Sequence, residues 1–229
     1  MSTPVVLVHG WGGSFEQTWR RNGFVDLLAD AGRPVIGVDL LGHGDAPKPH
    51  DPAAYADLTT RVLDALPDEP VDAIGFSLGA MVLLQVAAAH PGRVRRLVAA
   101  GVGRNVFERG DDDHNARVLA GVDGTAPADD NIAQLFGRYA RSNGNDPLAL
   151  AAIMRREVAA PLTEASLANI TCPVLLVLGD RDFAGPGDRL LAALSDARLV
   201  TLPNTDHFAT VESFGFVDAA LEFLDAVPA

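Results

Sequence analysis

The feature that most constrains the fold of this chain is a regular alternation between short, apolar, β-branched runs and helix-like segments. Runs that are apolar on both faces are typical of strands in a parallel sheet that helices cover on each side. The runs occupy residues 5–8, 34–38, 71–76, 94–99, 174–178 and 198–202, and the clearest helix-like segments occupy 24–31, 53–66, 78–90, 189–194 and a last stretch from near 214. We therefore predict an α/β fold with a doubly wound, mostly parallel sheet, and we expect ligands outside the carboxyl ends of its strands.

Composition indicates one globular unit and excludes several classes of partner. The chain has 229 residues, 48% of them apolar, which is enough to bury a core without disulfides or a structural metal. Acidic residues outnumber basic ones 30 to 18, so the net charge of −12 disfavours nucleic acid and anionic membrane surfaces as partners. The first residues show no signal-peptide pattern, and no apolar run is long enough to cross a bilayer. We therefore expect a cytoplasmic protein.

Residues 104–168 interrupt the alternation. They carry helical patterns at 132–139 and 148–158 but no strand pattern. We expect a helical cap inserted between two parts of the core, residues 1–103 and 169–229. Within the cap, the Asn143-Gly144 pair predicts a flexible connection, and the acidic run 111–113 predicts a solvated loop. An insertion of this kind can act as a cover over a site.

The sharpest chemical signal is the pentapeptide Gly-Phe-Ser-Leu-Gly at 75–79, which lies where the run 71–76 stops and the segment 78–90 begins. This is the context of a nucleophile elbow, a strained strand-to-helix turn that lifts a serine hydroxyl out of the sheet. Small flanking residues are needed because neighbouring backbone passes close to the turn. Ser77 is therefore the predicted nucleophile.

A serine hydroxyl needs a base, and the base needs a group that orients it. His207 follows the run 198–202, and two carboxylates, Asp180 and Asp182, follow the run 174–178. The order serine, acid, histidine is the one expected after such an elbow. His207 is the predicted base, and either aspartate could orient it.

Backbone N–H groups that stabilise an oxyanion are predicted at Leu78, directly after the nucleophile, and at Trp11, in the glycine-rich stretch after the first run. Four side chains around these groups are the predicted pocket lining: Trp11, Phe76, Leu78 and Phe208. His9 and His43 are expected to form hydrogen bonds within loops, because no second pair at metal-ligand spacing accompanies them. We predict no metal and no cofactor.

Together these pieces resemble the α/β-hydrolase fold superfamily, in its small, cap-bearing serine esterase and lipase-like group. The matching segments are 9–12, 39–44, 75–79, 179–182 and 206–208. The resemblance implies a triad of Ser77, Asp182 and His207, with Asp180 bracing the turn. Family members usually begin with about two further strands, so we expect a sheet that lacks them. The run 34–38 then lies at an edge that invites coverage by a loop or by a second copy of the chain, as in a homodimer.

The resulting prediction is a serine hydrolase that cleaves a small or medium carboxylic ester through an acyl-enzyme. A serine nucleophile disfavours the haloalkane dehalogenase and epoxide hydrolase branches, which use a carboxylate. The same triad can act on thioesters, lactones or carbon–carbon bonds, or as a cofactor-free perhydrolase of the haloperoxidase type. A non-catalytic ligand-binding receptor on the same fold is the alternative of another class.

Overall fold

The core of the protein is a six-stranded parallel sheet. A computed structural model describes residues 2–108 and 112–228, and its strand order is β2-β1-β3-β4-β5-β6, with every neighbouring pair parallel. Each strand begins and ends within one residue of its predicted limits, so the predicted doubly wound α/β fold is confirmed. The strands are β1 (Val5–Val8), β2 (Val35–Val38), β3 (Val71–Phe76), β4 (Val94–Ala100), β5 (Val174–Gly179) and β6 (Ala197–Leu202).

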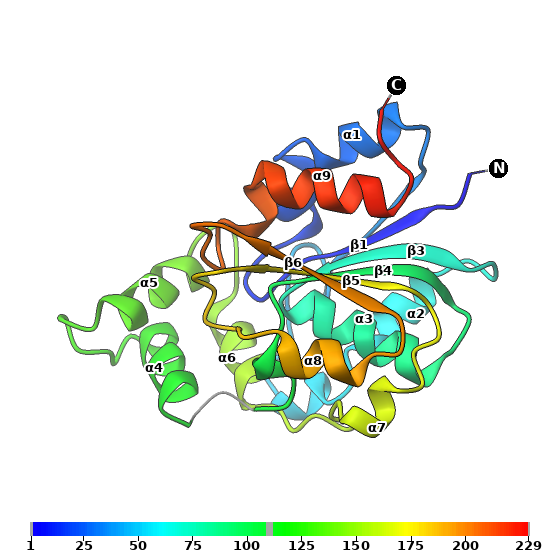
Figure 1. The fold of residues 1–229 in the computed structure, drawn as a ribbon. Helices are drawn as coiled ribbons and strands as arrows, with labels where there is room; N and C mark the ends of the chain where they lie inside the picture. The colour runs from blue at the N-terminus through cyan, green and yellow to red at the C-terminus, as the bar shows by residue number, and fades with distance from the viewer. Residues whose placement is uncertain (1, 109–111, 229) are drawn as a thin grey trace.

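Helices cover both faces of this sheet (Figure 1). On one face lie α1 (Phe24–Asp30) and α9 (Phe214–Phe223), and on the other lie α2 (Thr59–Ala65), α3 (Leu78–Ala89) and α8 (Asp188–Ala193). Side chains alternate between the faces along a strand. In β1, Val5 and Leu7 pack with the helices of the first face, whereas Val6 and Val8 pack with those of the second. Both sets are fully buried, which explains why the strand sequences carry no polar alternation.

The predicted helix over 53–66 is wrong in its first half. A short 3₁₀ helix, η2 (Pro52–Tyr55), comes first, and α2 begins only at Thr59. Asp51 caps η2 by accepting a hydrogen bond from the Ala53 N–H, and the Asp57 carboxylate accepts from both the N–H and the hydroxyl of Thr59. Aspartates that bind backbone two residues ahead favour turns over continuous helix, so the chain turns twice here.

The inserted segment between β4 and β5 is helical. It contains η3 (Arg104–Val106), α4 (Asp112–Asp123), α5 (Asn131–Ala140), α6 (Pro147–Arg155) and α7 (Glu164–Leu167). The helices α4, α5 and α6 lie beyond the carboxyl ends of the strands, on the left of Figure 1. The predicted loop at 111–113 is wrong for its last two residues, which begin α4, and Asp111 lies outside the described residues. None of the described helices is long and apolar enough to span a membrane.

The remaining short helices lie beside the strand ends that carry the predicted site. They are η1 (Glu16–Arg20), which follows β1, and η4 (Thr210–Glu212), which follows β6. At the far edge of the sheet, β2 pairs only with β1, as expected for the run 34–38. The C-terminal half of this strand is covered by Phe15, whose ring packs directly over Gly37.

A buried ionic cluster holds the opposite, amino end of the sheet. The Asp72 carboxylate, in β3, is fully buried and accepts hydrogen bonds from Arg33 and Arg95. Arg33 is also buried, and it donates further hydrogen bonds to the carbonyls of Thr3 and Leu224. The cluster therefore joins the start of β2, two central strands and the end of the last helix.

Replacing Asp72 by Asn should lower the free energy of unfolding by about 3–5 kcal/mol, because the buried Arg33 guanidinium loses its counter-charge. Urea denaturation at pH 7 measures this. Glu164→Gln is the control: it breaks the exposed pair between Glu164 and Arg189 and should cost less than about 1 kcal/mol. Equal losses in the two variants would contradict the structural role assigned to Asp72.

Candidate active site

Three side chains from separate strand ends form one chain of hydrogen bonds. Ser77 follows β3, Asp182 follows β5 and His207 follows β6. His207 Nε2 lies 3.0 Å from Ser77 Oγ, and His207 Nδ1 lies 2.8 and 2.9 Å from the two carboxylate oxygens of Asp182. Ser77 and His207 are 130 positions apart in sequence. The structure thus brings together the three residues predicted to act on a substrate.

The turn at Ser77 is strained. Its φ of 51° and ψ of −112° lie in a region that side chains other than glycine rarely occupy. Close packing against β1 maintains it: a Cβ atom on Gly79 would lie 2.5 Å from the carbonyl oxygens of Val8 and His9. Only glycine fits at that position, and the serine hydroxyl is presented at the start of α3 as the sequence predicted.

The structure distinguishes the two aspartates that sequence spacing left open. The Asp182 side chain is completely buried, contacts His207 and also accepts a hydrogen bond from the Ala184 N–H. Asp180 is exposed, and its carboxylate accepts from the Thr205 N–H at 3.2 Å. Asp180 therefore braces the loop that carries the histidine, whereas Asp182 orients the imidazole ring.

Aromatic rings surround the imidazole of His207. Ring centroids lie 4.3 Å away for Phe183, 4.9 Å for Phe76 and 5.9 Å for Phe208, the last in an edge-on arrangement. His207 is only 6% exposed. These rings therefore form an aromatic surround that keeps the imidazole largely out of contact with solvent. Phe183 was not predicted, although its place directly after Asp182 is a usable signal.

Two backbone N–H groups predicted to stabilise an oxyanion lie close to Ser77 in the chain or at the neighbouring strand end, after β3 and after β1. Neither the Trp11 N–H nor the Leu78 N–H donates a hydrogen bond to any residue that the structure describes. For Leu78 this follows from its position at the first residue of α3, where N–H groups lack helical partners. Free N–H groups beside a nucleophile are what an oxyanion requires.

The peptide group that carries the Trp11 N–H is held through its carbonyl. This carbonyl belongs to Gly10, and it accepts hydrogen bonds from His9 Nδ1 at 2.7 Å and from the Gly13 N–H at 3.1 Å. Because the two ends of a planar peptide group point in opposite directions, holding the carbonyl turns the N–H the other way.

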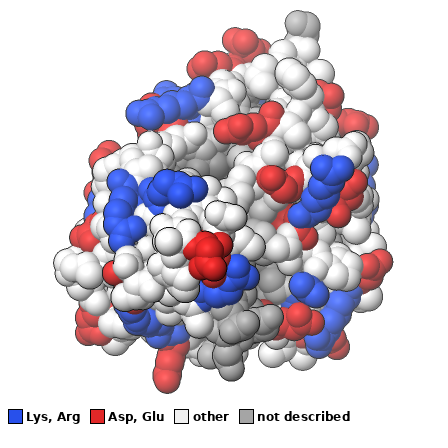
Figure 2. All heavy atoms as spheres, turned by 90° about the vertical axis from the view of Figure 1, so that its left-hand side faces the viewer, with Lys and Arg blue, Asp and Glu red and all other residues white. Residues whose placement is uncertain are grey.

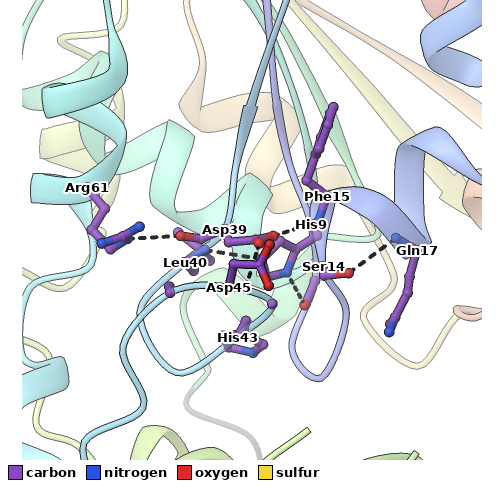
Figure 3. A network of polar contacts seen from close by, with 12 residues as sticks. His9, Ser14, Phe15, Gln17, Asp39, Leu40, His43, Asp45 and Arg61 are labelled. Atoms are coloured by element: carbon purple, nitrogen blue, oxygen red, sulfur yellow. Dashed lines mark hydrogen bonds and ion pairs between the residues drawn. The ribbon is translucent and has the colours of Figure 1, made fainter. Parts of the chain in front are cut away.

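His9 is held in one neutral form. Its Nε2 accepts a hydrogen bond from the Leu40 N–H at 3.1 Å, so the proton resides on Nδ1. Burial lowers the pKa of His9, and its contact with the Gly10 carbonyl opposes this only partly. The Asp39 carboxylate lies 3.6 Å from Nε2, yet an unprotonated nitrogen forms no ion pair. Asp39 instead accepts from the N–H groups of Phe15 and Asp45, which ties together the loops seen in Figure 3.

His43 packs against His9, with ring centroids 4.9 Å apart. It is fully buried, and its Nε2 has no hydrogen-bond partner among the described residues. Burial lowers the pKa of His43 well below its usual range, and the adjacent His9 adds to the effect. Among the residues that the structure describes, no group of three or more His, Cys, Asp or Glu side chains could hold a metal ion.

A cavity of about 250 Å³ opens beside Phe76, the residue before Ser77. Two of the four predicted pocket residues, Phe76 and Phe208, line it, whereas Trp11 and Leu78 are absent from its described lining. Leu78 is 8% exposed and packs in the core. Trp11 packs against Phe136 and Tyr139 of the cap. The cavity is lined by Gly10, Gln17, Thr18, Phe76, Tyr139, Asn143, Phe208, Val211 and Glu212.

Charge and thiol chemistry add little to this site. Figure 2 shows acidic and basic side chains intermixed on the face of the molecule that carries the cap. Burial raises the pKa of Cys172 to about 11, so this thiol is protonated at neutral pH. It packs in the core.

Comparison with known proteins shows the family to which this fold belongs. A family model described as "alpha/beta hydrolase fold" matches residues 3–131. A pimeloyl-[acyl-carrier protein] methyl ester esterase of Neisseria meningitidis serogroup B is 33% identical over 89% of this chain and 85% of its own length. A 2-hydroxymuconate semialdehyde hydrolase of Pseudomonas sp. is 36% identical over 43% of this chain and 36% of its own length. The solved 2-hydroxy-6-oxo-6-phenylhexa-2,4-dienoate hydrolase of Rhodococcus sp. superposes with a TM-score of 0.74, at 20% identity, over 98% of this chain and 91% of its own.

The buried histidines predict a specific pH dependence of stability. Since burial lowers the pKa of His43 below its ordinary value of 6.5, the unfolded chain binds a proton that the folded chain does not. Stability is therefore full above about pH 6.5 and is lost as the pH falls below it, by up to about 1.4 kcal/mol per pH unit for each such group.

Urea unfolding at pH 7.5 and pH 5.5 should show this loss in the wild type and a smaller loss in His43→Gln. His90→Gln is the control, because His90 is exposed and its removal should leave the difference between the two pH values unchanged. A His43→Gln variant that loses as much stability as the wild type would contradict the prediction.

Proposed function

The chain belongs to the alpha/beta hydrolase fold family, and we propose that it is a serine hydrolase that cleaves small or medium carboxylic esters through an acyl-enzyme on Ser77. The observation that carries this proposal is the buried hydrogen-bond chain from Asp182 through His207 to Ser77. Two free N–H groups lie at the same strand ends. This arrangement can activate a hydroxyl and stabilise the charge that its attack creates.

Acylation begins when His207 Nε2 takes the proton of the Ser77 hydroxyl as Oγ attacks the ester carbonyl carbon. The carbonyl oxygen becomes an oxyanion, which the N–H groups of Trp11 and Leu78 stabilise. Asp182 holds the ring so that Nδ1 carries its proton and Nε2 faces the serine. The imidazolium then gives its proton to the leaving alcohol oxygen, and the carbon–oxygen bond of the ester breaks.

Deacylation repeats these steps with water in place of the serine hydroxyl. His207 takes a proton from water, whose oxygen attacks the acyl carbon of the Ser77 ester. The same N–H pair stabilises the second oxyanion. Protonated His207 returns a proton to Ser77 Oγ, and the carboxylic acid leaves.

Methyl esters are the substrate class to test first. One relative that covers 89% of this chain is named as a methyl ester esterase, and a methanol leaving group needs little space beside the buried His207. The cavity of about 250 Å³ suits a short or medium acyl arm, and its lining by both apolar and polar side chains suits a neutral arm.

Replacing Ser77 by Ala should lower kcat/KM for p-nitrophenyl and methyl esters by at least about 10³-fold, because the nucleophile is lost while the oxyanion donors remain. It should also abolish covalent labelling by a fluorophosphonate. Stopped-flow hydrolysis of a series from acetate to dodecanoate measures the burst and the preferred chain length. Ser166→Ala is the control, since Ser166 lies in α7 and labelling should persist.

The outcomes separate the proposed esterase from its alternatives. Labelling that survives in Ser77→Ala would show that another residue is the nucleophile. Labelling of the wild type at Ser77 without ester turnover would redirect the proposal to thioesters, lactones, carbon–carbon bonds or perhydrolysis. A wild type that is not labelled would favour a binding protein on the same fold.

Replacing Asp182 by Asn should lower kcat/KM by about 10³- to 10⁴-fold, because an amide favours the wrong imidazole tautomer. Asp180→Asn should stay within fivefold of the wild type, since Asp180 contacts a backbone N–H and not the imidazole. Steady-state kinetics of both variants on one ester tests the assignment. The reverse order of effects would transfer the orienting role to Asp180.

A further inference from the structure

Hydrogen bonds join the cap directly to the loop that carries the Trp11 N–H. Asn145 lies on the connection between α5 and α6, and its side-chain Nδ2 donates to the Gly12 carbonyl at 2.7 Å and to the Tyr139 carbonyl at 3.4 Å. Both partners are acceptors only. The nitrogen of the amide must therefore face them, which decides the orientation of the side chain.

The contact with Gly12 is the first link of a continuous chain of peptide groups. The Gly12 carbonyl and the Gly13 N–H belong to one peptide group, and this N–H donates to the Gly10 carbonyl at 3.1 Å. The Gly10 carbonyl and the Trp11 N–H belong to the next peptide group in this chain of hydrogen bonds. The chain of hydrogen bonds therefore runs from the Asn145 amide through two peptide groups and ends at the Trp11 N–H, which the proposed function assigns to the oxyanion.

We propose that Asn145 is a positioning residue of the oxyanion hole, acting through these two peptide groups on the Trp11 N–H. The inference rests on the proposed function, since it assigns a role within the same site. Each hydrogen bond in such a chain orients and polarises the next peptide dipole. An oxyanion donor is effective only when it is held in place before the charge develops.

The Gly10–Gly13 loop needs a contact from outside to hold it, because its glycines allow several backbone conformations. Gly12 has a φ of 74°, and a Cβ atom there would lie 2.6 Å from the Tyr139 ring. Glycine is thus required, but glycine also leaves the backbone free to adopt other conformations. The indole Nε1 of Trp11 donates to the Leu150 carbonyl in α6 at 3.2 Å, which adds a second link from this loop to the cap.

The experiment must separate positioning of the donor from simple attachment of the cap. His50 offers a matched control: its Nε2 contacts the Asp146 carboxylate at 2.8 Å, one residue from Asn145, and joins the same connection to the loop after β2. This contact does not touch the chain of peptide groups. His50→Ala therefore removes a contact between cap and core but keeps the hydrogen bond from Asn145 to the Gly12 carbonyl.

We would measure kcat and KM on one ester for Asn145→Ala, Asn145→Asp and His50→Ala, with active sites counted by the fluorophosphonate burst. A trifluoromethyl ketone that adds to Ser77 reports on the oxyanion directly, and thermal unfolding reports on stability. In Asn145→Ala we expect kcat to fall about tenfold with KM within twofold, and the inhibition constant of the ketone to rise by a similar factor. Asn145→Asp has the same shape but no donor, so its kcat and its affinity for the ketone should fall at least as far.

His50→Ala should keep kcat and ketone affinity within twofold of the wild type. The inference is overturned if Asn145→Ala behaves like His50→Ala, if only KM changes, or if the loss disappears once active sites are counted. A wild type that neither hydrolyses esters nor binds the ketone overturns the proposed function together with this inference. An active wild type with unchanged Asn145 variants overturns the inference alone.

Discussion

The close approach between the end of β1 and the first turn of α3 is the contact on which the site depends. At Gly79 the backbone of Val8 and His9 comes near enough to exclude any side chain. This packing holds the strained turn at Ser77 and places the Gly10–Gly13 loop, which continues from β1, close to it. The strain is tolerated because the surrounding buried parallel sheet fixes the backbone on both sides of the turn. In the proposed function, the nucleophile and the oxyanion donors therefore share one rigid support.

The other parts of the site reach this support from the core and from the cap. His9 is neutral because it is buried and accepts a hydrogen bond from the Leu40 N–H. Its Nδ1 donates to the Gly10 carbonyl and holds it in place. The cap contributes Tyr139, whose ring covers Gly12, and the Leu150 carbonyl, which accepts a hydrogen bond from the Trp11 indole. In this arrangement the cap supports the Gly10–Gly13 loop and also forms a wall of the cavity. The amino end of the sheet is held independently by the buried cluster around Asp72.

The local sequence pattern predicted the structure correctly wherever one physical cause dominated. Strand limits followed from β-branched runs buried on both faces, and the elbow followed from a glycine-flanked serine between a strand and a helix. The helix at 53–66 was mispredicted because Asp51 and Asp57 bind nearby backbone, which competes with a periodic pattern. Asn145 went unrecognised because nothing in its immediate sequence indicates which residue it contacts. Asn145 and Gly12 lie 133 positions apart, and that contact exists only when the chain is folded.

By itself, the sequence determined the parallel α/β architecture, the identity of Ser77 and His207 as the residues to bring together, and the glycines that a close turn requires. These follow from hydrophobic periodicity and from residues whose chemistry is local. Only the tertiary structure decided that Asp182 and not Asp180 contacts the imidazole, that the Trp11 indole binds the cap, and that Asn145 reaches the Gly12 carbonyl. Such choices depend on where buried side chains can find partners, and burial at a given point in space is a property of the whole packed chain.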